Sequence, residues 1–168
     1  ALFCARREVA RQFALDLAAK AKAQRLSLAE GILSILDKRG VRRGTAKSAK
    51  GRTLILTEIE VALALPGPLT LAVLTFPFRD QHPFKNVGQI ADAGEVEAII
   101  RLWTIGTAIN ALGVDCKVIA LRDGNRYPCT WHINAESKRN YGDSFREFVE
   151  ALSLNDCLEV RDIDDQTD

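Results

Sequence analysis

In the first part of the chain an apolar residue recurs every three or four positions, which is the period of a helix packed on one side. The Ala-rich stretch 5–25 carries Val9, Phe13 and Leu17 at the spacing of one helical face. We therefore predict a helix over this stretch, with these three side chains turned toward the core.

Two further helices are predicted before the middle of the chain. Ser27 and Glu30 form an S-x-x-E capping box ahead of the apolar stretch 28–36, and Gly40 is expected to end that helix. Residues 53–65 are dense in apolar side chains and ambiguous between helix and strand. We favour a helix, which the following Pro-Gly-Pro sequence ends.

A different pattern begins at residue 69, where "LTLAVLTF" is a nearly continuous apolar run. Such a run is typical of a strand that is covered on both faces of a parallel sheet. Asp92 and Glu95 repeat the capping pattern and begin a helix that ends near Gly113. Its apolar stripe consists of Val96, Ile99, Ile100, Trp103 and Thr107.

The rest of the chain continues this alternation. "VDCKVIALRDG" predicts a second strand, residues 136–152 a helix, and "CLEVRDI" a short last strand. The order β-α-β-α-β predicts a single α/β domain over residues 1–168, with a Rossmann-like, three-layered parallel sheet, flanking helices and an N-terminal helical segment.

Composition agrees with a globular protein. Of the 168 residues, 47% are hydrophobic and 27% charged, and the net charge of +1 does not call for nucleic acid or a membrane as partner. No transmembrane run or signal peptide is visible, so we expect a cytoplasmic protein. The four cysteines are far apart in sequence, which favours reduced thiols over a disulfide framework: Cys4, Cys116, Cys129 and Cys157.

One segment, residues 40–52, carries five cations, several small residues and no acid. Three interpretations remain open: a solvated linker, a loop that closes over an anionic substrate, and a nucleic-acid patch. The linker is favoured because no aromatic residue interleaves the charges, as single-strand binders usually require.

Polar side chains follow two strands of the predicted sheet. Arg79, His82 and Lys85 come after the first strand, and Arg122 and Arg126 come at the end of the second. Ligands of open α/β sheets bind outside the carboxyl ends of the strands. We therefore expect the lysine and the three arginines among them to surround a site for a phosphate or a carboxylate. The alternative is that they belong to ordinary polar loops.

Other motifs are weaker. Asp92 and Glu95 are first of all helix caps. Cys129 and His132 have no matching second pair, so a metal site is not predicted. The chain has neither a GxGxxG nor a Walker sequence, so a dinucleotide or a nucleoside triphosphate is not predicted either.

The first of these polar segments resembles the pyoverdine/dityrosine biosynthesis family, which includes the isocyanide (isonitrile) synthases. The family pattern is F-P-x-K-S-x-N-x-x-K, then Gly three residues later, then P-D-x-x-E. This chain shows the same spacing without a gap in Phe76, Pro77, Arg79, Asp80, His82, Lys85, Gly88, Asp92 and Glu95.

The resemblance covers residues 69 to about 162. Asp123, Gly124 and Tyr127 match a later S-D-G segment that ends in an aromatic residue, and Tyr141 matches a tyrosine that opens the next helix. The chain departs from the pattern in having arginine, aspartate, histidine and alanine where the family has lysine, serine, asparagine and proline. It is also short, as expected of a short or truncated member.

The resemblance implies a cofactor-free reaction in which an amino-acid amine condenses with the ketone of ribulose 5-phosphate. The implied catalytic residues are His82, Lys85, Glu95 and Asp123. The implied substrate-binding residues are Arg79, Arg122, Arg126 and Tyr127. The implied partners are the two small-molecule substrates and a downstream iron- and 2-oxoglutarate-dependent oxygenase. The departures and the short length support an alternative, a non-catalytic α/β domain that binds a phosphorylated or carboxylated small molecule or a partner enzyme.

Overall fold

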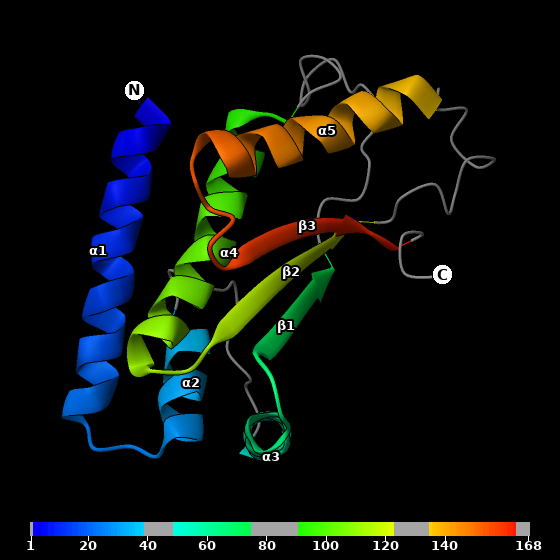
Figure 1. Ribbon diagram of the computed structural model, residues 1–168. Coiled ribbons are helices and arrows are strands. Elements are labelled where there is room, and N and C mark those ends of the chain that lie inside the picture. Colours follow the sequence, from blue (N-terminus) through cyan, green and yellow to red (C-terminus); the bar gives the residue numbers. More distant parts are fainter. Residues whose placement is uncertain (1, 39–48, 75–90, 123–134, 164–168) are drawn as a thin grey trace.

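The structure is a computed structural model that describes residues 2–38, 49–74, 91–122 and 135–163. Its elements follow one another in the order α1 (Leu2–Ala23), α2 (Leu28–Leu36), α3 (Ala49–Ala64), β1 (Leu69–Leu74), α4 (Ala93–Leu112), β2 (Cys116–Arg122), α5 (Ala135–Ala151) and β3 (Leu158–Asp162) (Figure 1). The predicted helical start and the β-α-β-α-β order that follows it are both confirmed.

The three described strands form one parallel sheet in the order β1-β2-β3. Leu69 pairs with Cys116 at the start of β1, and Arg122 pairs with Asp162 at the end of β3. The polypeptide thus advances one strand at a time in one direction. Since such crossovers are almost always right-handed, α4 and α5 are expected on the same face of the sheet.

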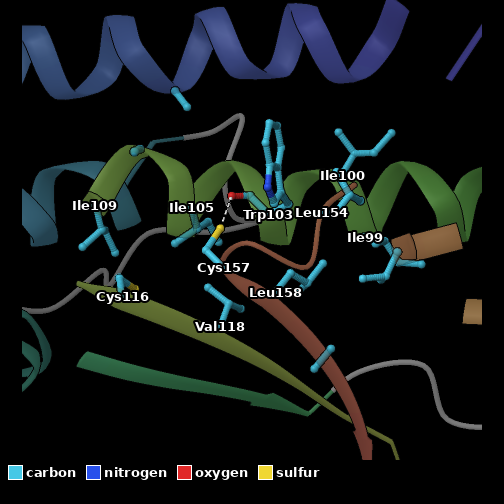
Figure 2. Close-up of a cluster of buried hydrophobic side chains, with 14 of the residues drawn as sticks. Ile99, Ile100, Trp103, Ile105, Ile109, Cys116, Val118, Leu154, Cys157 and Leu158 are labelled. Atoms are coloured by element: carbon cyan, nitrogen blue, oxygen red, sulfur yellow. Dashed lines mark hydrogen bonds between the residues drawn. The ribbon is translucent and has the colours of Figure 1, made fainter. Parts of the chain in front are cut away.

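Burial along the strands agrees with this one-sided arrangement. In β2, the side chains of Cys116, Val118, Ala120 and Arg122 are buried, while those between them are only half-buried. The layers among the described elements are therefore α1, then α4, then the sheet, as Figures 1 and 2 show. We predicted that β1 is covered on both faces, and this is wrong as far as the described helices are concerned. Exposed side chains alternate along β1 with buried or half-buried ones, and Leu74 is exposed.

Helix α4 lies at the centre of the core, and its side chains are buried both toward α1 and toward the sheet (Figure 2). The indole nitrogen of Trp103 donates a hydrogen bond to Asp156 at 2.6 Å. At Gly106 the helix backbone comes so close to the sheet layer that an added Cβ would lie 2.7 Å from the Sγ of Cys157. A side chain at this position would push α4 away from the sheet, so the glycine permits the close packing of these layers.

The predicted helix caps are confirmed. Ser27 with Glu30, and Asp92 with Glu95, form complete capping boxes. Gly113 ends α4 in the left-handed conformation with a φ of 100°. The predicted stop at Gly40 is wrong, because α2 already ends at Leu36 and is followed by Asp37 as its C-cap.

The face of α1 that packs on the core differs from the predicted one. Leu17 is buried as expected, but Val9 and Phe13 are exposed. The buried positions are instead Ala14, Leu17, Ala18 and Ala21, which are mostly small. Small side chains let α1 approach its neighbours closely, so the alanines rather than the larger residues form the contact.

The helix predicted at residues 53–65 is also confirmed, and it begins earlier than expected. Residues 49–52, predicted to end the basic loop, form the first turn of α3. The rest of that loop, residues 40–48, lies outside the described residues. No helix in the described part of the chain is long and apolar enough to cross a lipid bilayer.

The thiols of the core provide a direct check on this packing. Cys116 and Cys157 are buried, and burial raises the pKa of each thiol to about 12. Since the thiolate is the reactive species, we expect iodoacetamide at about pH 8 to alkylate the exposed Cys4 quickly and these two only upon unfolding. Peptide mass mapping with and without denaturant measures this, and fast labelling of either buried thiol in the native protein would contradict the packing.

The outward face of the sheet carries a salt-bridge network that makes stability depend on pH. Arg161 and Lys117 both bind the carboxylate of Glu159, and the hydrogen bond from Arg161 is the main reason why its pKa falls from 4.5 to about 2. A lowered pKa in the folded state stabilises the protein above pH 4.5, and this contribution is lost as the pH falls toward 2. Because Glu159 is about one-third exposed, we expect about 1 kcal/mol after solvent screening.

Urea unfolding between neutral pH and pH 2 tests this contribution. The wild-type free energy of unfolding should fall more steeply below pH 4.5 than that of Glu159→Gln. Glu150→Gln, at an exposed position of α5, is the matched control and should behave as wild type. Identical pH profiles for wild type and Glu159→Gln would show that the network does not stabilise the fold.

Candidate functional site at the carboxyl edge of the sheet

The polar side chains of the described core gather where the parallel strands end. β2 ends at Arg122, and β3 ends at Asp162, its partner in the strand register. The N-terminus of α4, with Asp92 and Glu95, and the first half of α5, with Tyr141, meet the same edge. This is the edge at which open α/β sheets bind their ligands.

Arg122 is the most unusual residue of this edge, because its side chain is a cation that is only 3% exposed. It follows Val118 and Ala120 in the alternation of β2, so the strand directs it beneath the helices rather than into solvent. Gly142 in α5 makes room for it: a Cβ there would lie 2.0 Å from the Nη1 of Arg122. A glycine inside a helix lowers the stability by about 1 kcal/mol relative to alanine. Here the buried guanidinium explains why position 142 is a glycine, since no Cβ fits beside it.

The guanidinium of Arg122 is enclosed by one acid and two aromatic rings. Its Nη1 lies 3.2 Å from Oδ1 of Asp162, close enough for an ion pair although the two groups are not aligned for a hydrogen bond. Its Cζ lies 5.7 Å and 5.9 Å from the ring centroids of Tyr141 and Phe145. Among the described residues, Nε of Arg122 has no hydrogen-bond partner. A buried cation with incomplete hydrogen bonding favours an anion beside it.

Asp162 is shared between two cations. While Oδ1 faces Arg122, Oδ2 accepts a hydrogen bond at 3.0 Å from Arg146, which also pairs with Asp143 at 3.0 Å. The acid at the end of β3 therefore ties the sheet to α5 through Arg146, and it also pairs with Arg122 of the neighbouring strand. Because it is divided in this way, its charge compensates that of Arg122 only in part.

Glu95 and Tyr141 form the second part of the site. One carboxylate oxygen of Glu95 accepts the backbone N–H of Asp92 at 2.8 Å, and the other accepts the phenolic hydroxyl of Tyr141. The same tyrosine ring faces Arg122, so Tyr141 links the carboxylate on α4 to the cation on β2. The three groups are thus neighbours although they come from three elements.

Ser144 holds α5 against the start of α4. Its buried hydroxyl accepts the backbone N–H of Ala91 at 2.9 Å and donates to the carbonyl of Tyr141 at 2.7 Å. The ring of Tyr141 also packs edge-on against Phe145, with centroids 5.0 Å apart. These contacts fix both the position and the orientation of the phenol.

Of the site residues predicted from the sequence, the structure describes Glu95 and Arg122, and it brings both to this edge. The other six lie outside the described residues: Arg79, His82, Lys85, Asp123, Arg126 and Tyr127. The CTWH segment at residues 129–132 lies outside them as well. The described residues hold no group of three or more potential metal ligands.

Four residues of the site were not predicted from the sequence: Asp162, Arg146, Gly142 and Ser144. Tyr141 was named only through the resemblance. A signal for Asp162 was present, because the acid ends the third strand and the end of the second strand is Arg122. The glycine inside the predicted helix 136–152 was a second signal, since it marks a position where something approaches the backbone closely.

Chemically, the arrangement can bind an anion and can transfer protons. The phenol of Tyr141 donates to a carboxylate that can accept its proton, and the adjacent guanidinium favours negative charge nearby. An anionic group that reached Arg122 would lie close to this acid–base pair.

Comparison with known protein families, with curated protein sequences and with solved structures finds no match.

The contact between Gly142 and Arg122 predicts a reversal of sign in mutant stability. Gly142→Ala should destabilise the wild-type protein by about 1–3 kcal/mol, because the enclosed guanidinium cannot yield to the new methyl group. In an Arg122→Ala background the same substitution should be neutral or stabilising by up to about 1 kcal/mol, because the helix gains a better helix former.

A double-mutant cycle measured by urea unfolding gives the two values directly. If Gly142→Ala costs the same free energy in both backgrounds, the side chain of Arg122 does not occupy the space beside α5.

Proposed function

We propose that this chain is an isocyanide synthase-like enzyme whose active site is the carboxyl edge of the sheet. In this reaction the amine of an amino acid condenses with the ketone of ribulose 5-phosphate to an imine, with loss of water. Cleavage of both carbon–carbon bonds of the former ketone carbon then releases the remaining sugar carbons and the phosphate, and leaves that carbon as the isocyanide carbon. One observation carries the proposal: Glu95, Tyr141 and Arg122 lie next to one another in the fold. In the sequence these positions are far apart, and only the predicted strand end and the spacing of the family pattern relate them.

The roles of the described residues follow from their contacts. Glu95 accepts a proton and Tyr141 returns one, because the phenolic hydroxyl already donates to the carboxylate. Arg122 attracts the phosphate or the carboxylate of a substrate through the part of its guanidinium that lacks a hydrogen-bond partner among the described residues. The network of Asp162, Arg146 and Ser144 keeps these groups in place.

The resemblance adds residues whose side chains the structure does not describe. Lys85 and Arg126 are proposed to bind the phosphate, and His82 is proposed to transfer protons together with Glu95 or Asp123. Arg79 is proposed to bind the carboxylate of the amino acid, and Tyr127 to stack on an aromatic substrate. The proposal includes no cofactor, and a downstream oxygenase remains the proposed partner.

A second function is favoured by a specific observation. Both carboxylate oxygens of Glu95 are already engaged, one in the helix cap and one by Tyr141, as is common for a residue with a structural role. In that case the edge of the sheet binds an anionic small molecule through Arg122 without transforming it.

Mass spectrometry of the protein with pooled amino acids and ribulose 5-phosphate separates these functions. A product with one carbon more and two hydrogens fewer than an amino acid is expected from the enzyme. Tyr141→Phe removes only the hydroxyl and should reduce turnover by about 10²- to 10⁴-fold. Glu95→Gln should act similarly, and it keeps the helix cap because glutamine also serves in a capping box.

Glu147→Gln is the matched control, because it makes the same change at an exposed position of α5 and should leave turnover unchanged. Stabilisation by the sugar phosphate without any product, lost in Arg122→Met, would favour the non-catalytic function. Absence of both turnover and stabilisation would contradict both functions.

A further inference from the structure

One side of α1 carries large apolar side chains that the described residues leave exposed. Leu2, Arg6, Val9 and Phe13 follow one another at helical spacing and form one stripe, which we call the α1 stripe. Leu2 and Val9 are more than half exposed, and Phe13 is 40% exposed. Exposed apolar side chains that gather on one surface are typical of interaction sites.

The α1 stripe borders a cavity of about 210 Å³ between α1 and α4. Val9 and Phe13 line it from α1, and Ile100 and Thr104 line it from α4.

Two arginines on the rim of this cavity differ in their partners. The Nη2 and Nε of Arg6 donate hydrogen bonds to Oε1 and Oε2 of Glu97, at 2.6 Å and 3.2 Å, so the charge of Arg6 is already compensated. Arg101 has no ion-pair partner among the described residues. The rim of the cavity therefore offers one cation to an acid from outside the molecule.

Helix α3 presents a second stripe with the same spacing. Leu54, Glu58 and Val61 of α3 and Leu65, the residue directly after its end, form this α3 stripe. The last three lie four, seven and eleven positions after Leu54, as the members of the α1 stripe do after Leu2. All three apolar members of the α3 stripe are more than half exposed. Glu58 has no ion-pair partner among the described residues.

The two stripes complement each other in their apolar pattern and in charge. Aligned in parallel, each apolar residue of one meets an apolar residue of the other, and Glu58 comes opposite Arg6 and beside Arg101. Within one molecule they cannot meet, because α1 and α3 lie on opposite sides of α2 (Figure 1). Each stripe spans about 17 Å along its helix, three turns, which is enough for a compact helix–helix contact.

We propose that the α1 stripe of one molecule binds the α3 stripe of a second copy of this chain, in parallel register, with Glu58 paired to Arg101. Apolar side chains of α3 then cover the cavity between α1 and α4. The contact joins two different surfaces and is therefore heterologous, so it closes into a ring or continues as a chain of molecules. It does not depend on the function of the site at the edge of the sheet.

Size-exclusion chromatography with light scattering, at increasing protein concentration, tests the assembly. The wild type should exceed the monomer mass of 18.5 kDa as its concentration rises. Glu58→Lys and Arg101→Glu should each weaken association by about tenfold or more, because each places like charges together. An equal mixture of the two variants should regain association, because the lysine introduced in one molecule then faces the glutamate introduced in the other.

Glu60→Lys is the matched control: it makes the same charge change on the exposed surface of α3 but lies off the stripe, and should associate as wild type. Circular dichroism verifies that each variant is folded. A wild type that stays at 18.5 kDa at all concentrations, an equal effect of Glu58→Lys and Glu60→Lys, or a mixture that fails to associate would each overturn the proposal.

Discussion

The burial of α4 on two opposite sides is the constraint on which the rest of this structure depends. A helix that is apolar nearly all round cannot face water, so it requires a layer on each side. The sheet supplies one layer and the N-terminal helices supply the other, as Figure 2 shows. Gly106 sets the distance to the sheet, because it brings the helix backbone against Cys157. The N-terminal helices are thus a structural part of the domain and complete its core.

The position of α4 also creates the candidate site. Its capped N-terminus is held at the carboxyl edge of the sheet, where Glu95 meets Tyr141 of α5. Arg122, in contrast, is a charged side chain that is buried, because the alternation along β2 places it on an otherwise apolar face of the strand. A buried charge destabilises the fold unless it is paired. Here one carboxylate and two aromatic rings stabilise the guanidinium. The edge combines a rigid acid–base pair with a cation that is only partly compensated.

The first two turns of α4 connect this site to the surface proposed for assembly. Glu95 points to α5 and binds Tyr141, whereas Glu97, two residues later, binds Arg6 of α1. Successive carboxylates on one helix therefore serve two sides of the molecule. Since α1 packs along α4, a partner bound to the α1 stripe would rest on the helix that carries Glu95. The outward face of the sheet is different, because its cations Lys117 and Arg161 both pair with the carboxylate of Glu159.

Local patterns were sufficient to predict the elements of this protein. Capping boxes, glycine stops and the switch of apolar period depend on neighbours within a few residues, so Ser27, Asp92 and Gly113 marked helix ends correctly, whereas Gly40 did not. The parallel α/β class followed from the alternation of elements. Placement of Glu95 and Arg122 at one edge followed as well, because the ends of parallel strands meet there.

The sequence by itself thus determined where helices and strands form and which edge of the sheet collects polar groups, since both are matters of local spacing and chain direction. Only the tertiary structure decided which side of α1 is buried, because Ala14 and Ala18 pack more closely than Val9 and Phe13 can. It also decided that the described helices cover one face of the sheet and that Asp162 and Gly142 surround Arg122. These outcomes depend on contacts between residues far apart in the chain, which local periodicity does not encode.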